Sequence, residues 1–103
     1  MDVDEYAAWA AKAARIPESG TRDPERLSYL ALGLAGEAGE VADHVKKLLR
    51  DGDNAWKPGE VAEELGDVIF YWAALCVACG RPPSDVLAAS RTKIEARIAS
   101  RAD

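Results

Sequence analysis

Hydrophobic residues recur at helical spacing along four segments of this chain, and no segment alternates strictly as a half-buried β-strand does. Clusters of glycine and proline separate the segments at 17–24, 52–59 and 80–83. We therefore predict helices over residues 3–15, 23–50, 58–80 and 83–100. The fold class that follows is all-α, with four helices forming a bundle in one domain over residues 1–103.

Local signals at the helix ends support these limits. Asp23, Pro24 and Glu25 form a typical helix start, with a capping carboxylate, a proline at the first position and an acid in the first turn. Gly52 follows the second segment and Gly80 ends the third, where glycine commonly terminates a helix. The second and third helices should therefore form an antiparallel hairpin that turns near Gly52.

Each helix of this hairpin carries an apolar seam whose members are three or four residues apart, the spacing typical of helices that pack side by side. The seams are Leu27, Leu34, Ala38, Val41, Val45 and Leu48 in the second helix, and Val61, Leu65, Val68, Trp72, Leu75 and Cys79 in the third.

Four acidic residues stand beside these seams. Glu37 and Glu40 lie three apart in the second helix, and Glu64 and Asp67 lie three apart in the third. Because the two pairs are mirror images about Gly52, an antiparallel hairpin brings all four carboxylates to one height. Each acid directly precedes a seam residue, so the four side chains should lie half-buried at the flank of the core.

Carboxylates cannot be packed together in their charged form without a compensating cation. An all-oxygen ligand set selects Mg²⁺, with Mn²⁺ as a substitute, over zinc or copper. Mg²⁺ held by carboxylates usually also binds phosphate, so the pattern indicates a metal site that acts on a phosphate compound. The alternative is a pair of solvated acidic helix faces.

Further residues on the same helices are candidates for substrate contacts. Lys47 follows Glu40 by two turns and could reach a phosphate, and Tyr71 follows Asp67 by one turn and could contact sugar or base. His44 lies one turn beyond Glu40 and is either a ligand or a surface or hydrogen-bonding residue. Lys47 could equally be a cation at the end of its helix with no role in binding, and Tyr71 could equally be a partly buried aromatic residue.

The fourth helix carries Lys93 and Arg97, four residues apart. If this helix folds over the hairpin, both cations can neutralise phosphates; otherwise they form a solvated basic face. Trp9 and Trp56 are either core residues or platforms on which a base stacks. The pattern of the sequence leaves both choices open.

Composition narrows the function further. Hydrophobic residues make up 49% of the 103 residues, charged residues 30%, and the net charge is -5. Such an acidic chain without a basic cluster is not expected to bind nucleic acid polymers. The sequence shows neither a signal peptide nor an apolar run long enough to span a membrane, so we expect a cytoplasmic protein. A core of this size would hardly cover all four apolar faces, which favours self-association.

The two cysteines, Cys76 and Cys79, are three residues apart in an apolar part of the third helix. A zinc site would require two further ligands, and the chain has one histidine. We expect two buried small apolar residues, with a redox pair as the alternative.

Residues 32–43 and 63–71, with the sequences LGLAGEAGEVAD and EELGDVIFY, closely resemble the MazG-like family of all-α nucleoside triphosphate pyrophosphohydrolases. The family signature, E-x-x-E followed after a spacer by E-x-x-D, corresponds to Glu37, Glu40, Glu64 and Asp67. The resemblance implies a MazG-like bundle and Mg²⁺-dependent hydrolysis of a nucleoside triphosphate to a monophosphate and pyrophosphate, a house-cleaning reaction of nucleotide pools.

By the same resemblance, the four acids hold the metal, and one of them positions or deprotonates the water. Lys47 and Tyr71 occupy positions that face substrate. The family's last helix often reads N-x-x-K-x-x-x-R, which here corresponds to Ser90, Lys93 and Arg97. Serine in place of asparagine leaves the base or sugar contact open, and the Tyr-Pro that often follows the arginine is replaced by Ile98 and Ala99. Short members assemble as dimers or tetramers.

Three alternatives compete with general triphosphate hydrolysis. One is a specialised pyrophosphatase of the same superfamily that acts on dUTP or phosphoribosyl-ATP. Another is a non-catalytic helical interaction module, against which the complete set of four acids argues. A di-iron carboxylate bundle would need Glu-x-x-His on two helices. Position 43 is Asp here, and the third helix contains no histidine.

Overall fold

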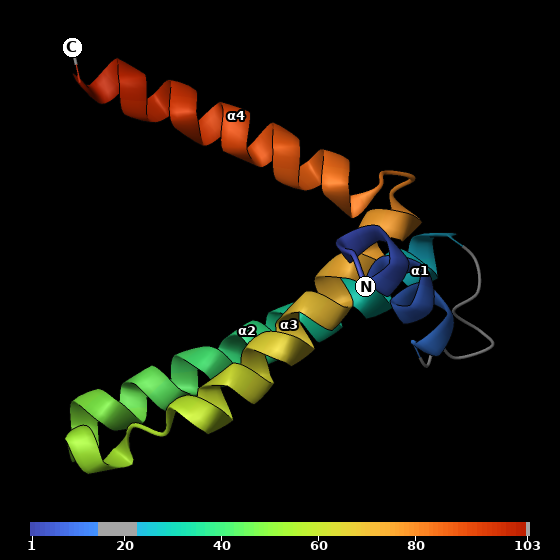
Figure 1. The fold of residues 1–103 in the computed structure, drawn as a ribbon. Coiled ribbons are helices and arrows are strands. Elements are labelled where there is room, and N and C mark those ends of the chain that lie inside the picture. Colours follow the sequence, from blue (N-terminus) through green and yellow to red (C-terminus); the bar gives the residue numbers. More distant parts are fainter. Residues whose placement is uncertain (15–22, 103) are drawn as a thin grey trace.

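Helices make up almost all of the chain in the computed structural model, which describes residues 1–14 and 23–102. In chain order these are α1 (Val3–Ala13), α2 (Asp23–Asp51), the short 3-10 helix η2 (Asp53–Ala55), α3 (Pro58–Ala78) and α4 (Pro83–Ala102). The described residues contain no strand, so the all-α prediction is confirmed (Figure 1). None of their helices has an apolar stretch sufficient to cross a bilayer.

The helix limits agree with the predicted ones to within two residues wherever the chain is described. The first predicted helix extended to Arg15, which lies outside the described residues, as does most of the predicted connection at 17–24. Gly52 follows α2 with a φ of 91°, and Gly80 follows α3 with a φ of 73°. Both values fall in the region that favours glycine, which explains why the helices end there.

The helices α2 and α3 lie side by side and run in opposite directions, connected by η2 (Figure 1). Helix α1 packs across α3 near the end of the hairpin that is distant from η2. The buried cluster of the core lies there and consists largely of alanine, with Ala7, Ala10, Leu30, Ala73 and Ala74 all almost fully buried. Small side chains at this crossing allow the helix backbones to approach closely.

The rest of the hairpin is far less covered. Of the twelve predicted seam residues, Val61 alone is buried, whereas Leu65 is 52% exposed and Val45 is 41% exposed. The predicted seams and the observed burial differ because, within the part of the chain that the structure describes, only α1 and the first turns of α4 pack on the hairpin.

Helix α4 leaves the hairpin immediately after its first turns. It contacts α1 and α3, and it has no contact with α2 among the described residues. Figure 1 shows it diverging from the hairpin, so that the two arms form an open V. The condition under which Lys93 and Arg97 would meet the acids, namely a fourth helix folded over its own hairpin, is therefore not fulfilled within one chain.

Candidate metal centre

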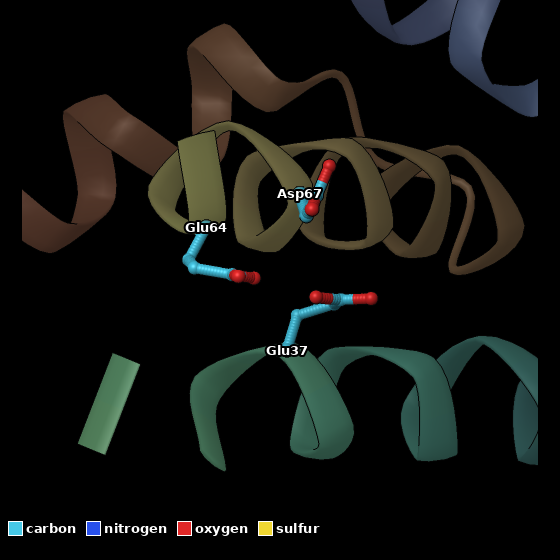
Figure 2. Close-up of side chains that lie close together, drawn as sticks. All are labelled: Glu37, Glu64 and Asp67. Carbon is cyan, nitrogen blue, oxygen red and sulfur yellow. The ribbon is translucent and has the colours of Figure 1, made fainter. Parts of the chain in front are cut away.

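Three of the four predicted acids meet between the helices of the hairpin. Glu37 projects from α2 and faces Glu64 and Asp67, which project from α3 (Figure 2). One carboxylate oxygen from each residue lies within 4.8 Å of the others. Carboxylates at this spacing can share one hard cation, and the all-oxygen donor set fits Mg²⁺ or Mn²⁺.

The local sequence explains this meeting. Glu64 and Asp67 are three residues apart, so they lie on neighbouring positions of one helix face. The turn at Gly52 and η2 sets the register of the hairpin and places Glu37 opposite this pair. The prediction from mirror symmetry thus brought together the correct segments of the two helices.

Glu40 lies outside this cluster of three. Its side chain is exposed, one turn beyond Glu37 on α2. Its charge nevertheless acts on Glu37, since it is one of the charges that raise the pKa of that carboxyl. The fourth acid is therefore a neighbour of the cluster and points into solvent.

The pKa of Glu37 shows the electrostatic cost of the cluster. Burial raises it above its ordinary value, and the charges of Asp67 and Glu64 raise it further. No Lys or Arg side chain pairs with the three clustered acids among the described residues. A group of carboxylates with excess negative charge and no Lys or Arg partner is the electrostatic environment that a divalent cation relieves.

The nearest basic group is His44, whose Nε2 lies 3.8 Å from Glu64 Oε1. The His44 side chain is 14% exposed and that of Glu64 is 23% exposed. This separation is longer than a hydrogen bond. His44 therefore lies beside the cluster, too far from Glu64 for a hydrogen bond.

Lys47 is engaged elsewhere. Its Nζ lies 3.1 Å from Asp43 Oδ2, and the Lys46 Nζ lies 3.5 Å from the other oxygen of the same carboxylate. The hydrogen bond and charge of Lys47 hold the pKa of Asp43 below its ordinary value. Sequence reasoning missed this role of Asp43, although its spacing of four residues from Lys47 was a sufficient signal.

Tyr71 packs its ring against the backbone of Gly33, where a Cβ atom would overlap the ring carbons. Its ring also contacts that of Phe70, with centroids 5.4 Å apart. Burial raises the pKa of the Tyr71 hydroxyl, and the charges of Tyr29, Glu37 and Asp67 add to this effect. Tyr71 therefore lies near the cluster while its ring belongs to the packing between α2 and α3.

Lys93 and Arg97 both lie on the exposed part of α4. Neither has an ion-pair partner among the described residues. The structure brings Glu37, Glu64 and Asp67 together, with Tyr71 near enough to feel the charges of Glu37 and Asp67, and it places Lys93 and Arg97 on the other arm of the V.

The remaining candidate residues, two tryptophans and two cysteines, lie away from the acid cluster or pack against other side chains. Trp9 contacts Phe70 in an edge-to-face arrangement with ring centroids 5.8 Å apart, although it is 56% exposed, and Trp56 is 37% exposed. Both cysteines are free; Cys76 is buried, as expected, whereas Cys79 is exposed at the end of α3. Burial raises the pKa of the Cys76 thiol, which makes it less reactive.

Comparison with known proteins links this site to a family. The sequence profile of the MazG nucleotide pyrophosphohydrolase domain matches residues 25–100. The gene 37 protein of Mycobacterium phage L5 is 46% identical over 79 residues, which cover 73% of this chain and 69% of that protein. The dCTP pyrophosphatases 1 of Rattus norvegicus and Mus musculus are each 44% identical over 55 residues, or 48% of this chain and 32% of theirs. No solved structure gives a significant match.

Proposed function

This chain belongs to the MazG nucleotide pyrophosphohydrolase family, and on that premise we propose that it is a Mg²⁺-dependent nucleoside triphosphate pyrophosphohydrolase. The reaction is (d)NTP + H₂O → (d)NMP + pyrophosphate. Water supplies the new oxygen on phosphorus, and the bond between the bridging oxygen and the α- or β-phosphorus breaks. The observation that carries the proposal is the meeting of Glu37, Glu64 and Asp67 from two helices, with ligand atoms within 4.8 Å.

In this proposal Glu37, Glu64 and Asp67 hold the metal. When bound, Mg²⁺ neutralises phosphate oxygens and lowers the pKa of a coordinated water. Glu40 is exposed and adjacent to the cluster, so its carboxylate is available as a further ligand or to orient and deprotonate the attacking water. The raised pKa of Glu37 supports this assignment, because three crowded carboxylates without a cation disfavour their own ionisation.

Substrate contacts follow from residues around the cluster. Tyr71 lies close enough to Glu37 and Asp67 for their charges to affect its hydroxyl, so it can contact the sugar or base. Lys47 would exchange Asp43 for a phosphate, which is feasible because both side chains are partly exposed. Lys93 and Arg97 would meet the remaining phosphate charge. We further propose a cytoplasmic homo-oligomer, a dimer or tetramer, that takes part in nucleotide-pool house-cleaning.

Deoxycytidine triphosphate is the first substrate to test, because two relatives are dCTP pyrophosphatases. Purified protein and Mg²⁺ are incubated with dCTP, the other dNTPs, dUTP and phosphoribosyl-ATP, and the products are separated chromatographically. Monophosphate plus pyrophosphate, lost on Glu40→Gln and retained on Glu63→Gln, is the expected result. Glu63 is the matched control, since it is an exposed glutamate next to Glu64.

Two outcomes would redirect the proposal. Faster turnover of dUTP or phosphoribosyl-ATP than of any ordinary dNTP would replace general house-cleaning by a specialised pyrophosphatase. The absence of turnover with every nucleotide, together with thermal stability that does not respond to Mg²⁺, would support the non-catalytic interaction module.

A further inference from the structure

His44 reaches the edge of the acid cluster from the same helix as Glu37. It follows Glu37 by two turns, and it therefore lies on the same side of α2. Its side chain is 14% exposed, and its Nε2 lies 3.8 Å from Glu64 Oε1 on α3. Glu64 thus has two neighbours on α2, with Glu37 inside the cluster and His44 beside it.

The imidazole ring of His44 has one polar neighbour. Within residues 1–14 and 23–102, its approach to Glu64 is the only polar contact that the ring makes. A polar ring that is largely buried costs free energy unless it is paired, whereas an apolar side chain would fill the same space without this cost. The presence of a histidine at this position therefore points to a role toward Glu64.

Glu64, in turn, has one basic neighbour. Among the described residues, no Lys or Arg side chain pairs with it, and its ion-pair contact is the one with His44. Glu64 also lies inside α3, where backbone N–H groups bind carbonyls of their own helix. Carboxylates that bind a metal are commonly oriented by a hydrogen bond from a neighbouring group. His44 is the described side chain placed to donate that bond.

The distance between the two side chains is small enough for one of them to close. An N–H···O hydrogen bond extends to about 3.2 Å between its heavy atoms, and the observed separation is 3.8 Å. The Glu64 side chain is 23% exposed, so it has room to rotate about its own bonds. A modest rotation of this side chain brings its oxygen within reach of the imidazole N–H.

We propose that His44 is a positioning residue of the metal centre, which donates a hydrogen bond to Glu64 when a cation is bound and thereby favours Mg²⁺ or Mn²⁺ over Ca²⁺. The proposal rests on the assignment of Glu64 as a metal ligand in the proposed function. A hydrogen bond to one carboxylate oxygen leaves the other oxygen to face the cation. Mg²⁺ requires compact octahedral coordination, whereas Ca²⁺ accepts more ligands and often takes both oxygens of a carboxylate.

The test compares two replacements of His44 that differ in one property. His44→Gln keeps a side-chain N–H donor, and His44→Met has a similar length and shape without a donor. His44→Leu repeats the removal of the donor with a branched side chain. Lys46→Gln is the control for a change of charge on the same helix, since the Lys46 amine pairs with Asp43 and is exposed. Circular dichroism without metal checks that each variant is folded.

Mn²⁺ binding to each protein is measured by electron paramagnetic resonance without nucleotide, and Mg²⁺ and Ca²⁺ are then used as competitors. We expect His44→Met and His44→Leu to weaken Mn²⁺ and Mg²⁺ binding about 10-fold, the lower end of the range for groups that orient metal ligands. Ca²⁺ binding should change less, so that the preference over Ca²⁺ falls. His44→Gln should bind all three ions more nearly as wild type does, and Lys46→Gln should match wild type.

Three results would overturn the role of His44 while leaving the metal centre intact. The first is Mn²⁺ affinity in His44→Met and His44→Leu equal to that of wild type. The second is equal weakening in His44→Gln and His44→Met, since the donor would then be irrelevant. The third is a directly bonded ¹⁴N in the spin-echo modulation of bound Mn²⁺, which would make the imidazole a ligand. Wild-type protein that binds no Mn²⁺ would overturn the metal centre and this role together.

Hydrolysis assays separate this inference from the proposed function. If both hold, His44→Met should need about 10-fold more Mg²⁺ for half-maximal nucleotide hydrolysis and regain most of its rate at saturating Mg²⁺. A rate that stays low at every Mg²⁺ concentration would contradict a role confined to metal binding. If wild type hydrolyses no nucleotide, the proposed reaction fails, while the Mn²⁺ titrations still decide the role of His44.

Discussion

The α2–α3 hairpin and α4 both carry large apolar side chains, but the two regions have very different surroundings. The hairpin places three of its candidate acids against one another, with Glu37 facing Glu64 and Asp67. In α4, by contrast, every residue beyond Leu87 is exposed as far as Arg101. An amphipathic pattern therefore indicates that one face of a helix tends to be buried. Whether another helix of the same chain buries that face depends on how the helices are arranged.

The hairpin differs most from α4 at the acid cluster, and there we expect a substitution to have the greatest effect on activity. Glu64→Gln should lower the rate of nucleotide hydrolysis at least about 100-fold, since even residues that only orient metal ligands cost up to that much when replaced. Glu63→Gln makes the same chemical change at an exposed neighbour and should leave the rate unchanged. Steady-state rates for both variants check this; equal rates would remove Glu64 from the metal centre.

The packing inside the hairpin can be tested at two glycines of α2. Gly33→Ala would drive a methyl group into the Tyr71 ring and should destabilise the fold by about 1–3 kcal/mol. Gly36→Ala meets no atom within 4 Å, and alanine's helix propensity should stabilise the protein by up to about 1 kcal/mol. Urea unfolding measures both changes. Equal effects at the two positions would show that the close approach of Tyr71 is not maintained in solution.

The base of α4 depends on one polar contact with α1. Asp4→Ala removes both hydrogen bonds to Ser84 and should lower the free energy of unfolding by about 0.5–2 kcal/mol, as the loss of a helix cap does. Ser84→Ala keeps the backbone hydrogen bond and should cost less. If thermal unfolding of the two variants were indistinguishable from wild type, the direction of α4 would not be set by this contact.

The smallest effect concerns pH. Because the folded state raises the pKa of Glu37 above its ordinary value of 4.5, ionisation of this carboxyl disfavours folding. In the presence of a chelator, its contribution to stability should be fully present below that value and be lost as pH rises through the folded pKa. Asp43 has the opposite sign, since its pKa is lowered. The difference in unfolding free energy between wild type and Glu37→Gln therefore isolates the effect; a difference independent of pH would contradict it.

The sequence alone predicted the parts of the fold that local chemistry determines. Gly52 and Gly80 end their helices because few other residues adopt the positive φ that these positions require. A glycine directly after a helical pattern is visible in the sequence, so both helix ends could be predicted. The meeting of Glu37 with the Glu64–Asp67 pair was likewise predictable, because two helices joined by a short turn have few registers available.

What the sequence did not reveal depends on contacts between distant residues. The direction of α4 is set by Asp4 and Ser84, which are 80 residues apart and carry no sequence signal of their pairing. The predicted seams located the apolar faces of the two helices, yet Leu65 and Val45 in these seams are exposed. The periodicity of a sequence shows that a helix has an apolar face, and it does not show which part of the protein covers that face. The exposed position of Glu40 depends on the exact register of α2 against α3, which η2 fixes. The spacing of residues in the sequence gives this register only approximately.

The central claim is that Glu37, Glu64 and Asp67 form one divalent-cation centre, and Mn²⁺ binding measured by electron paramagnetic resonance tests it most directly. Mn²⁺ is titrated into wild type, Glu37→Gln, Glu64→Gln, Asp67→Asn and the control Glu63→Gln. We predict that each of the three site variants weakens binding at least about 10-fold, while the control binds as wild type does. Equal Mn²⁺ affinity in all five proteins would contradict the assignment of the cluster as a metal centre.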